Sequence, residues 1–295
     1  MSNHLRGTSC LITGANSGIG WATALSLAEM GAEIWMLCRN PERGEEKRAE
    51  LAERCQEWGS PEPRLFLADL SDLESVQRVA RHIIEIGSTL DILINNAGLI
   101  VPTRQESAQG YEYTLAANHL GHFVLTHHLL PMLKSAPQGR IINVASRAHR
   151  VASIDWDDPH WSKRSYASFT IYGTTKLFNI LFTRALASRL QAQGSAVTVN
   201  SLHPGVIRTG FGKDYQGFFK TLVTIGGPLL ASPRRGAQTM IYLASSPEVA
   251  EVSGAYFIRR GQARPRALAR SDEQANRLWS LSEELCHDYL PEAHG

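Results

Sequence analysis

Short apolar runs rich in β-branched residues alternate along the chain with longer amphipathic stretches. Apolar runs bounded by turn residues are typical of buried strands, whereas apolar positions that recur at helical spacing predict helices. Strands that are apolar nearly throughout, each followed by a helix, predict an α/β fold with a doubly wound, Rossmann-type parallel sheet and helices on both faces. The predicted strands are residues 8–13, 32–37, 64–69, 91–98, 140–146, 196–205 and 254–260.

The predicted helices lie between these strands. They are residues 18–30, 41–58, 71–86, 110–134, 166–193 and 234–245, and a last helix begins at residue 271. Ser71 with Glu74, and Ser271 with Gln274, have the spacing of a capping box, in which each side chain satisfies a free backbone amide at the helix start.

Composition limits the classes of protein that fit. The 295 residues are 43% hydrophobic and 20% charged, which is typical of a globular chain, and the net charge of +2 gives no electrostatic case for binding nucleic acid or membranes. The four cysteines are scattered, and neither a secretory signal nor a transmembrane run is visible. We expect a single cytoplasmic domain over residues 1–295, with a substrate lid at about 210–232.

The stretch TGANSGIG, residues 13–20, joins the first strand to the first helix. Gly14, Gly18 and Gly20 leave room for a pyrophosphate to approach backbone amides and a helix N-terminus, although glycines also form tight turns without a ligand. The second strand ends in Cys38, Arg39 and Asn40, where an NAD site usually has an acidic residue. Arg39 can receive a 2′-phosphate, so the sequence favours NADP(H) over NAD(H).

A tyrosine and a lysine lie one helical turn apart in SFTIYGTTKLFN, residues 168–179. Taken alone, Tyr172 and Lys176 fit a packed phenol and a lysine whose head reaches solvent. They also fit acid–base chemistry, because a nearby ammonium group is expected to lower the pKa of a phenol.

All these motifs together resemble the short-chain dehydrogenase/reductase family over nearly the whole chain. NNAG, residues 95–98, is similar to the family's fourth-strand motif, and HPGVIRT, residues 203–209, resembles the segment that closes over the nicotinamide. The resemblance implies a catalytic tetrad of Asn118, Ser146, Tyr172 and Lys176. It implies cofactor contacts from Gly14, Asn16, Ser17, Gly18, Ile19, Gly20, Arg39, Asp69, Leu70, Asn96, Ala97, Gly98, Tyr172, Lys176, Pro204, Gly205, Ile207 and Thr209.

The implied reaction interconverts an alcohol and a carbonyl by hydride transfer. Tyr172 would be the general acid in reduction and the general base in oxidation, and Ser146 would stabilise the developing negative charge on the substrate oxygen. Lys176 would also bind the nicotinamide ribose, and Asn118 would hold a water that links Lys176 to solvent. A cofactor-binding sensor or scaffold without turnover is the alternative from another functional class.

CRNPERG, NHLGHF, SGAYF and the long interval from Ser146 to Tyr172 resemble the retinol dehydrogenase-like group within this family. Light-dependent protochlorophyllide reductases are also similar, but typically alter the fourth-strand motif. The apolar residues Phe218, Phe219, Leu222 and Val223 predict a lipophilic or aromatic carbonyl substrate, although a surface helix or dimer contact would have the same pattern. The family also implies a homodimer or homotetramer, paired through helices 110–134 and 166–193.

Three further features have simpler interpretations. The histidines His119, His122, His127 and His128 lack a completing carboxylate or cysteine, so we expect packing and no metal site. The acidic stretch 155–158 with His160, and the arginines at 259, 260, 264, 266 and 270, are expected to be solvated. Tyr166 has no lysine four residues later, so it is assigned to packing or to the substrate wall.

Overall fold

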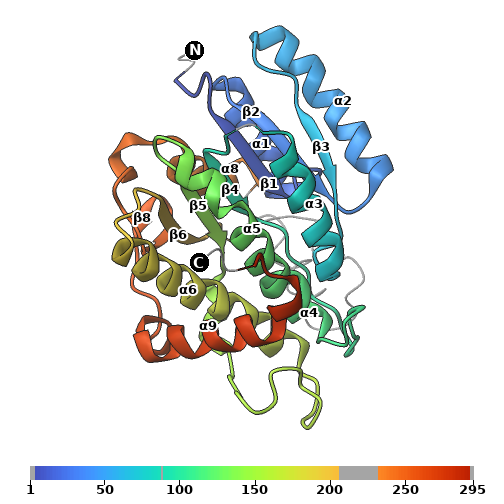
Figure 1. Ribbon diagram of the computed structural model, residues 1–295, viewed down its shortest axis with the longest axis vertical. Coiled ribbons are helices and arrows are strands. Elements are labelled where there is room, and N and C mark those ends of the chain that lie inside the picture. Colours follow the sequence, from blue (N-terminus) through green and yellow to red (C-terminus); the bar gives the residue numbers. More distant parts are fainter. Residues whose placement is uncertain (1–3, 88, 206–231, 293–295) are drawn as a thin grey trace.

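The computed structural model describes residues 4–87, 89–205 and 232–292, and its centre is one eight-stranded sheet (Figure 1). The strand order is β3-β2-β1-β4-β5-β6-β7-β8. The strands are β1 Ser9–Thr13, β2 Glu33–Cys38, β3 Arg64–Leu67, β4 Ile92–Asn95, β5 Arg140–Val144, β6 Thr198–His203, β7 Tyr256–Ile258 and β8 Gly261–Gln262. The first seven are parallel, as predicted, whereas the short β8 pairs antiparallel with β7 and was not predicted.

Helices cover both faces of the sheet (Figure 1). One face carries α1 Gly18–Glu29, α2 Pro41–Trp58 and α8 Pro233–Ser245, and the other carries α3 Leu73–Glu85, α5 Gly121–Ser135 and α6 Ser168–Ala192. The C-terminal helix α9, Asp272–Cys286, packs against α6 from outside. The short elements are α4 Tyr113–Leu115, the π-helix η1 Ala116–Leu120, and the 3-10 helices η2 Arg147–Val151, η4 Pro247–Val249, η5 Ala267–Arg270 and η6 His287–Tyr289.

An aromatic cluster holds α5, α6 and α9 together. The Trp279 ring of α9 lies 5.3 Å from the Phe123 ring of α5, measured between centroids, and Phe123 lies 5.4 Å from Phe182 of α6. The predicted dimer would pair through the helices that carry Phe123 and Phe182. In this structure α9 of the same chain already packs on that surface, and the oligomeric state stays a prediction.

Several predicted boundaries are wrong in ways that follow from local chemistry. The helix predicted to start at Ser71 has Asp72 as its N-cap, with its carboxylate accepting from the Glu74 amide. The Ser71 hydroxyl instead donates to Asp69, 2.6 Å away. At α9 the predicted Ser271 cap is confirmed, since Ser271 accepts from the Gln274 amide.

Two predicted elements are shorter than their apolar patterns suggested. The strand predicted over 91–98 ends at Asn95, which leaves Asn96, Ala97 and Gly98 beyond the strand. The helix predicted over 110–134 begins at Tyr113 and contains the π-helical turn 116–120. A π turn inserted into an α-helix is often found at functional sites.

The strand order places a crevice beside β1. The chain moves outward from β1 to β3 and then crosses back to β4, so β1 and β4 are neighbours whose connections leave in opposite directions. In open parallel sheets, ligands bind at the carboxyl ends of the strands where this reversal occurs. Most of the predicted cofactor residues follow the carboxyl ends of the parallel strands, whereas Asn118, Tyr172 and Lys176 lie in helices.

Candidate active site

The glycine-rich turn after β1 forms a cradle of bare backbone. Gly14 and Gly18 have backbone φ angles of 66° and 56°, in a region that residues other than glycine rarely adopt. A Cβ on Gly20 would lie 2.3 Å from the Gly14 carbonyl oxygen, so only glycine fits there. Ser17, the N-cap of α1, makes no capping hydrogen bond through its side chain. This cradle at a helix N-terminus fits a phosphate group; Asn16 lies in the turn and Ile19 in the first turn of α1.

Thr13 fastens the end of β4 to the end of β1. Its hydroxyl oxygen accepts hydrogen bonds from the amides of Asn96 and Ala97, both at 2.9 Å, and the Asn96 side chain donates to the Thr13 carbonyl at 2.7 Å. No pattern in the sequence points to Thr13. Its contribution depends on the pairing of two strands far apart in the chain.

Arg39 and Asp69 lie at neighbouring strand ends, as predicted. An Arg39 Nη1 atom donates to the Tyr113 hydroxyl at 2.9 Å and lies 3.7 Å from an Asp69 carboxylate oxygen. The Arg39 side chain is 60% exposed, so its guanidinium can contact a ligand from solvent. Leu70 is buried beside Asp69.

Ser146 and Tyr172 approach each other from η2 and α6. Ser146 is the N-cap of η2, and its hydroxyl accepts from the Ala148 amide at 3.1 Å. The side chains of Ser146 and Tyr172 are hydrogen-bonded. Burial raises the pKa of Tyr172 to about 12, and the hydrogen bond with Ser146 opposes that rise. The prediction that the pKa of Tyr172 is lowered is therefore wrong for the protein without bound cofactor. Burial removes water from the phenolate, and this effect on the pKa is the largest one.

Lys176 is buried one turn after Tyr172. Its Nζ donates to the Val144 carbonyl at 3.1 Å, and it lies 5.5 Å from the centroid of the Tyr172 ring. Burial lowers the pKa of Lys176 to about 8, because a charged ammonium loses its hydration. The Asn179 side chain donates to the same Val144 carbonyl, at 3.0 Å.

Asn118 lies in the π-helical turn, and its side chain is fully engaged. Its Oδ1 accepts from the Leu99 amide at 2.8 Å, and its Nδ2 donates to the Leu99 carbonyl at 2.8 Å and to the Thr175 hydroxyl at 3.1 Å. A Cβ on Gly98 would lie 3.1 Å from the Lys176 Nζ and 3.4 Å from the Asn118 Oδ1. The Gly98 backbone therefore lies close to both side chains.

A glycine next to Tyr172 allows η2 to pack on α6. Gly173 follows Tyr172, and a Cβ there would lie 2.5 Å from the Ala148 carbonyl oxygen. Only glycine lets η2, which starts from Ser146, approach α6 this closely. A lone glycine within a helical pattern signals such a contact only weakly.

The last predicted cofactor segment is described only in part. Pro204 and Gly205 follow β6, and Gly205 has a φ of 96°. Ile207, Thr209 and the four predicted lining residues from Phe218 to Val223 lie outside the described residues, as does all of the predicted lid except Ser232.

The predicted packing role of the histidines in η1 and α5 agrees with their contacts. His119 is buried against the Ser282 hydroxyl at 2.8 Å, and His122 against the Thr13 hydroxyl at 2.9 Å. Burial lowers the pKa of each to about 3. Within the described ranges, no group of three His, Cys, Asp or Glu residues could hold a metal ion.

In each of two stretches expected to be solvated, one residue has a structural role instead. Asp158 is buried and accepts from the Ser162 amide at 2.7 Å and the Lys163 amide at 3.1 Å, so it orders its own loop. The Arg266 guanidinium donates to the carbonyls of residues 149, 150 and 152, at 3.4, 3.2 and 3.0 Å. Arg266 therefore fastens the C-terminal segment to the end of η2.

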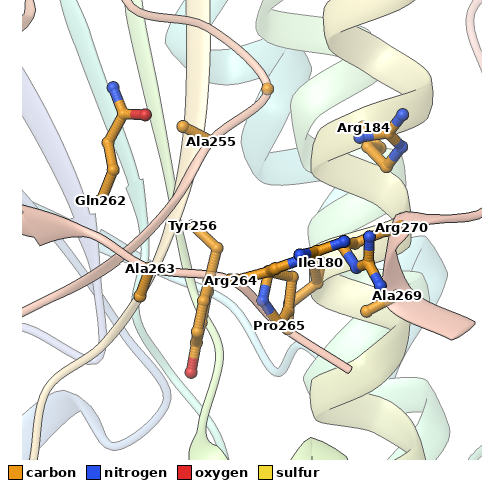
Figure 2. Close-up of a pocket in the computed structure, with 11 residues that line it drawn as sticks. Ile180, Arg184, Ala255, Tyr256, Gln262, Ala263, Arg264, Pro265, Ala269 and Arg270 are labelled. Atoms are coloured by element: carbon orange, nitrogen blue, oxygen red, sulfur yellow. The ribbon is translucent and has the colours of Figure 1, made fainter. Parts of the chain in front are cut away.

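A separate cleft of about 290 Å³ lies between α6, η5 and the β7–β8 hairpin (Figure 2). Arg184, Arg264 and Arg270 line it together with Tyr256 and Ile180. None of the predicted catalytic or cofactor residues is among its lining residues. Arg264 and Arg270 are exposed, as predicted for this arginine-rich stretch.

Known proteins resemble this chain in both sequence and fold. Residues 8–217 match the model of the short chain dehydrogenase family. The chain belongs to the short-chain dehydrogenase family. It is 40% identical to human retinol dehydrogenase 14 over 296 residues, which covers 95% of this chain and 87% of that protein. It therefore belongs to the retinol dehydrogenase-like group of the family and is an oxidoreductase that acts on an alcohol or carbonyl with a nicotinamide cofactor.

Solved structures of family members have the same fold. An uncharacterised protein from Mycobacterium paratuberculosis superposes with a TM-score of 0.77 at 30% identity, covering 99% of both chains. A Beutenbergia cavernae protein, described as an NAD(P)-dependent gluconate 5-dehydrogenase with bound NADP, superposes with a TM-score of 0.67 at 25% identity, over 88% of this chain and 97% of that one. Among the helices in the described part of the chain, none is long and apolar enough to cross a bilayer.

Proposed function

We propose that this short-chain dehydrogenase uses NADP(H) to interconvert a lipophilic or aromatic carbonyl compound and its alcohol, with Tyr172 as the acid–base group. The observation that carries the proposal is the hydrogen-bonded pair of Ser146 and Tyr172 hydroxyls, which lies beside the buried Lys176 where β5 ends. When bound, NADP(H) would supply or accept the hydride.

The protonation of Tyr172 favours its role as a proton donor. With a pKa of about 12, the phenol keeps its proton at neutral pH and can deliver it to a substrate oxygen during reduction. The Ser146 hydroxyl would donate to the same oxygen and stabilise the charge that develops there. In the oxidation direction Tyr172 would have to lose its proton first, so oxidation should accelerate with rising pH.

Two exposed apolar side chains beside Tyr172 support a lipophilic substrate. Phe169, 41% exposed, stacks on Tyr172 with 6.4 Å between ring centroids. Val151, 47% exposed, is the last residue of η2 and lies next to Gly173, the residue after Tyr172. Its Cγ2 is 3.1 Å from the point that a Cβ on Gly173 would occupy. Apolar surface next to a reacting group is typical of sites for apolar ligands. The name of human retinol dehydrogenase 14 points to the same class of substrate.

Arg39 supports the proposed preference for NADP(H). It follows β2, where the ribose of a dinucleotide lies in folds of this type, and neither Cys38 nor Asn40 beside it carries a negative charge. The nearby Asp69 carboxylate and the Tyr113 hydroxyl orient one edge of the guanidinium. The solved structure from Beutenbergia cavernae contains NADP.

The direct test is oxidation of NADPH and of NADH by the purified protein with a panel of carbonyl compounds. The panel should include aromatic and long-chain aldehydes, quinones and ketones, with glyceraldehyde as a small polar control. We expect the highest kcat/KM with NADPH and an apolar aldehyde. Preference for glyceraldehyde would contradict the substrate class, and NADPH binding without turnover of any compound would favour the non-catalytic sensor.

A further inference from the structure

The helix that carries Tyr172 starts without a side-chain cap. The N-cap of α6 is Ala167, whose side chain makes no capping hydrogen bond, and Tyr172 is only the fifth residue of this helix. A side-chain cap at this position commonly adds to the stability of the first turn of a helix. A long irregular segment, residues 152–167, precedes α6, so contacts made by this segment affect how firmly the helix start is held.

Tyr166 supplies such a contact. Its hydroxyl donates to the Oε1 of Glu112 at 2.9 Å. Glu112 is fully buried, and its carboxylate also accepts from the amides of Thr114 at 3.0 Å and Leu115 at 2.6 Å. Glu112 is thus the N-cap of the continuous helix that contains the π turn and Asn118. A carboxylate at a helix N-terminus is stabilised by the amides and by the helix dipole.

The Glu112–Tyr166 hydrogen bond therefore joins the starts of two helices, each six residues before a predicted catalytic side chain. One of these side chains is Asn118 and the other is Tyr172. Further contacts hold the preceding segment in place, since the Glu112 amide approaches the His160 ring at 3.4 Å and Tyr111 stacks on His160 at 5.4 Å between centroids. Deeper in the molecule, Asn118 donates to Thr175 of α6 at 3.1 Å.

We infer that Glu112 and Tyr166 are positioning residues that hold Tyr172 in line with Ser146 and Asn118 for the proton transfer. This inference rests on the proposed function. Because a displacement of about 1 Å at a reacting group costs up to about 100-fold in rate, a single hydrogen bond at this helix start can affect turnover.

The test compares Tyr166→Phe, which removes only the hydroxyl, with a matched control, Tyr242→Phe. The Tyr242 hydroxyl also donates to a glutamate, Glu248, at 2.9 Å, but that pair is exposed. We expect Tyr166→Phe to lower kcat about 10-fold with the KM for NADPH unchanged and a larger isotope effect from deuterated NADPH, because proton and hydride transfer become slower. Tyr242→Phe should behave as the native chain.

A double-mutant cycle tests whether the two residues act together. Glu112→Gln should also lower kcat, and the double variant with Tyr166→Phe should lose little more than Glu112→Gln alone. Independent, multiplicative losses would overturn the inference. Glu112→Gln also weakens a helix cap and could prevent folding. In that case the comparison of Tyr166→Phe with Tyr242→Phe alone decides the question.

A second measurement does not depend on turnover. Amide hydrogen exchange in peptides covering residues 168–176 should be at least about fivefold faster in Tyr166→Phe than in the native chain or Tyr242→Phe. Unchanged exchange and unchanged kcat would overturn the inference. If the native chain reduces no carbonyl compound, the proposed function fails, and the exchange measurement still decides whether Tyr166 fixes the start of α6.

Discussion

Replacing Lys176 by methionine should stabilise the protein. Burial lowers the pKa of Lys176 from 10.5 to about 8. At about 1.4 kcal/mol for each unit of pKa, the charged ammonium costs roughly 3 kcal/mol of folding free energy at pH 7. Methionine has a similar length and no charge. The Val144 carbonyl keeps its hydrogen bond from Asn179, at 3.0 Å, so the change leaves no orphaned acceptor.

The sign of the pH dependence follows from the two pKa values. Between about pH 8 and 10.5 the unfolded chain binds a proton at Lys176 that the folded chain has lost, so native stability rises with pH in this window. The advantage of Lys176→Met should therefore be largest below pH 8 and shrink as the pH rises to about 10.5.

Urea unfolding at a series of pH values measures this effect directly. Lys134→Met is the control, because Lys134 is exposed and its Nζ bonds the exposed Gln193 side chain. The reasoning would be refuted if the Lys176→Met variant were less stable than the native chain at pH 7. It would also be refuted if the difference in unfolding free energy between the two did not change with pH.

Three further predictions concern other parts of the molecule. Arg39→Asp should reverse the preference for NADPH over NADH in kcat/KM, and an unchanged ratio would show that another group reads the phosphate. Gly173→Ala should lower turnover and reduce the free energy of unfolding by about 1–3 kcal/mol, because its Cβ would lie 2.5 Å from the Ala148 carbonyl oxygen; native-like kinetics and stability would contradict this. Trp279→Ala should reduce stability by about 3–5 kcal/mol, measured by urea unfolding, whereas a loss below 1 kcal/mol would show that α9 contributes little.

The sequence predicted the sheet, and the strand ends at which the candidate residues lie, because both depend on local patterns. Apolar strands followed by helices determine a parallel sheet, and the carboxyl ends of its strands then determine where Gly14, Arg39 and Ser146 lie. The NADP(H) preference, the cytoplasmic location and the oligomeric state stay predictions.

The sequence could not reveal contacts that depend on packing between distant elements. Asp72 rather than Ser71 caps α3, because the Ser71 hydroxyl is used by Asp69. Glu112 looked like one charged residue among many, yet it is fully buried between two helix starts. The raised pKa of Tyr172 likewise depends on its burial in the folded chain and cannot be inferred from the spacing of Tyr172 and Lys176.

The central claim is that the Tyr172 hydroxyl transfers the proton, and Tyr172→Phe tests it most directly. The variant keeps the ring and its stacking on Phe169, and it removes only the group that bonds Ser146. We predict that kcat for carbonyl reduction falls at least about 100-fold while the dissociation constant for NADPH stays close to the native value. Turnover at the native rate by a correctly folded Tyr172→Phe would contradict the account.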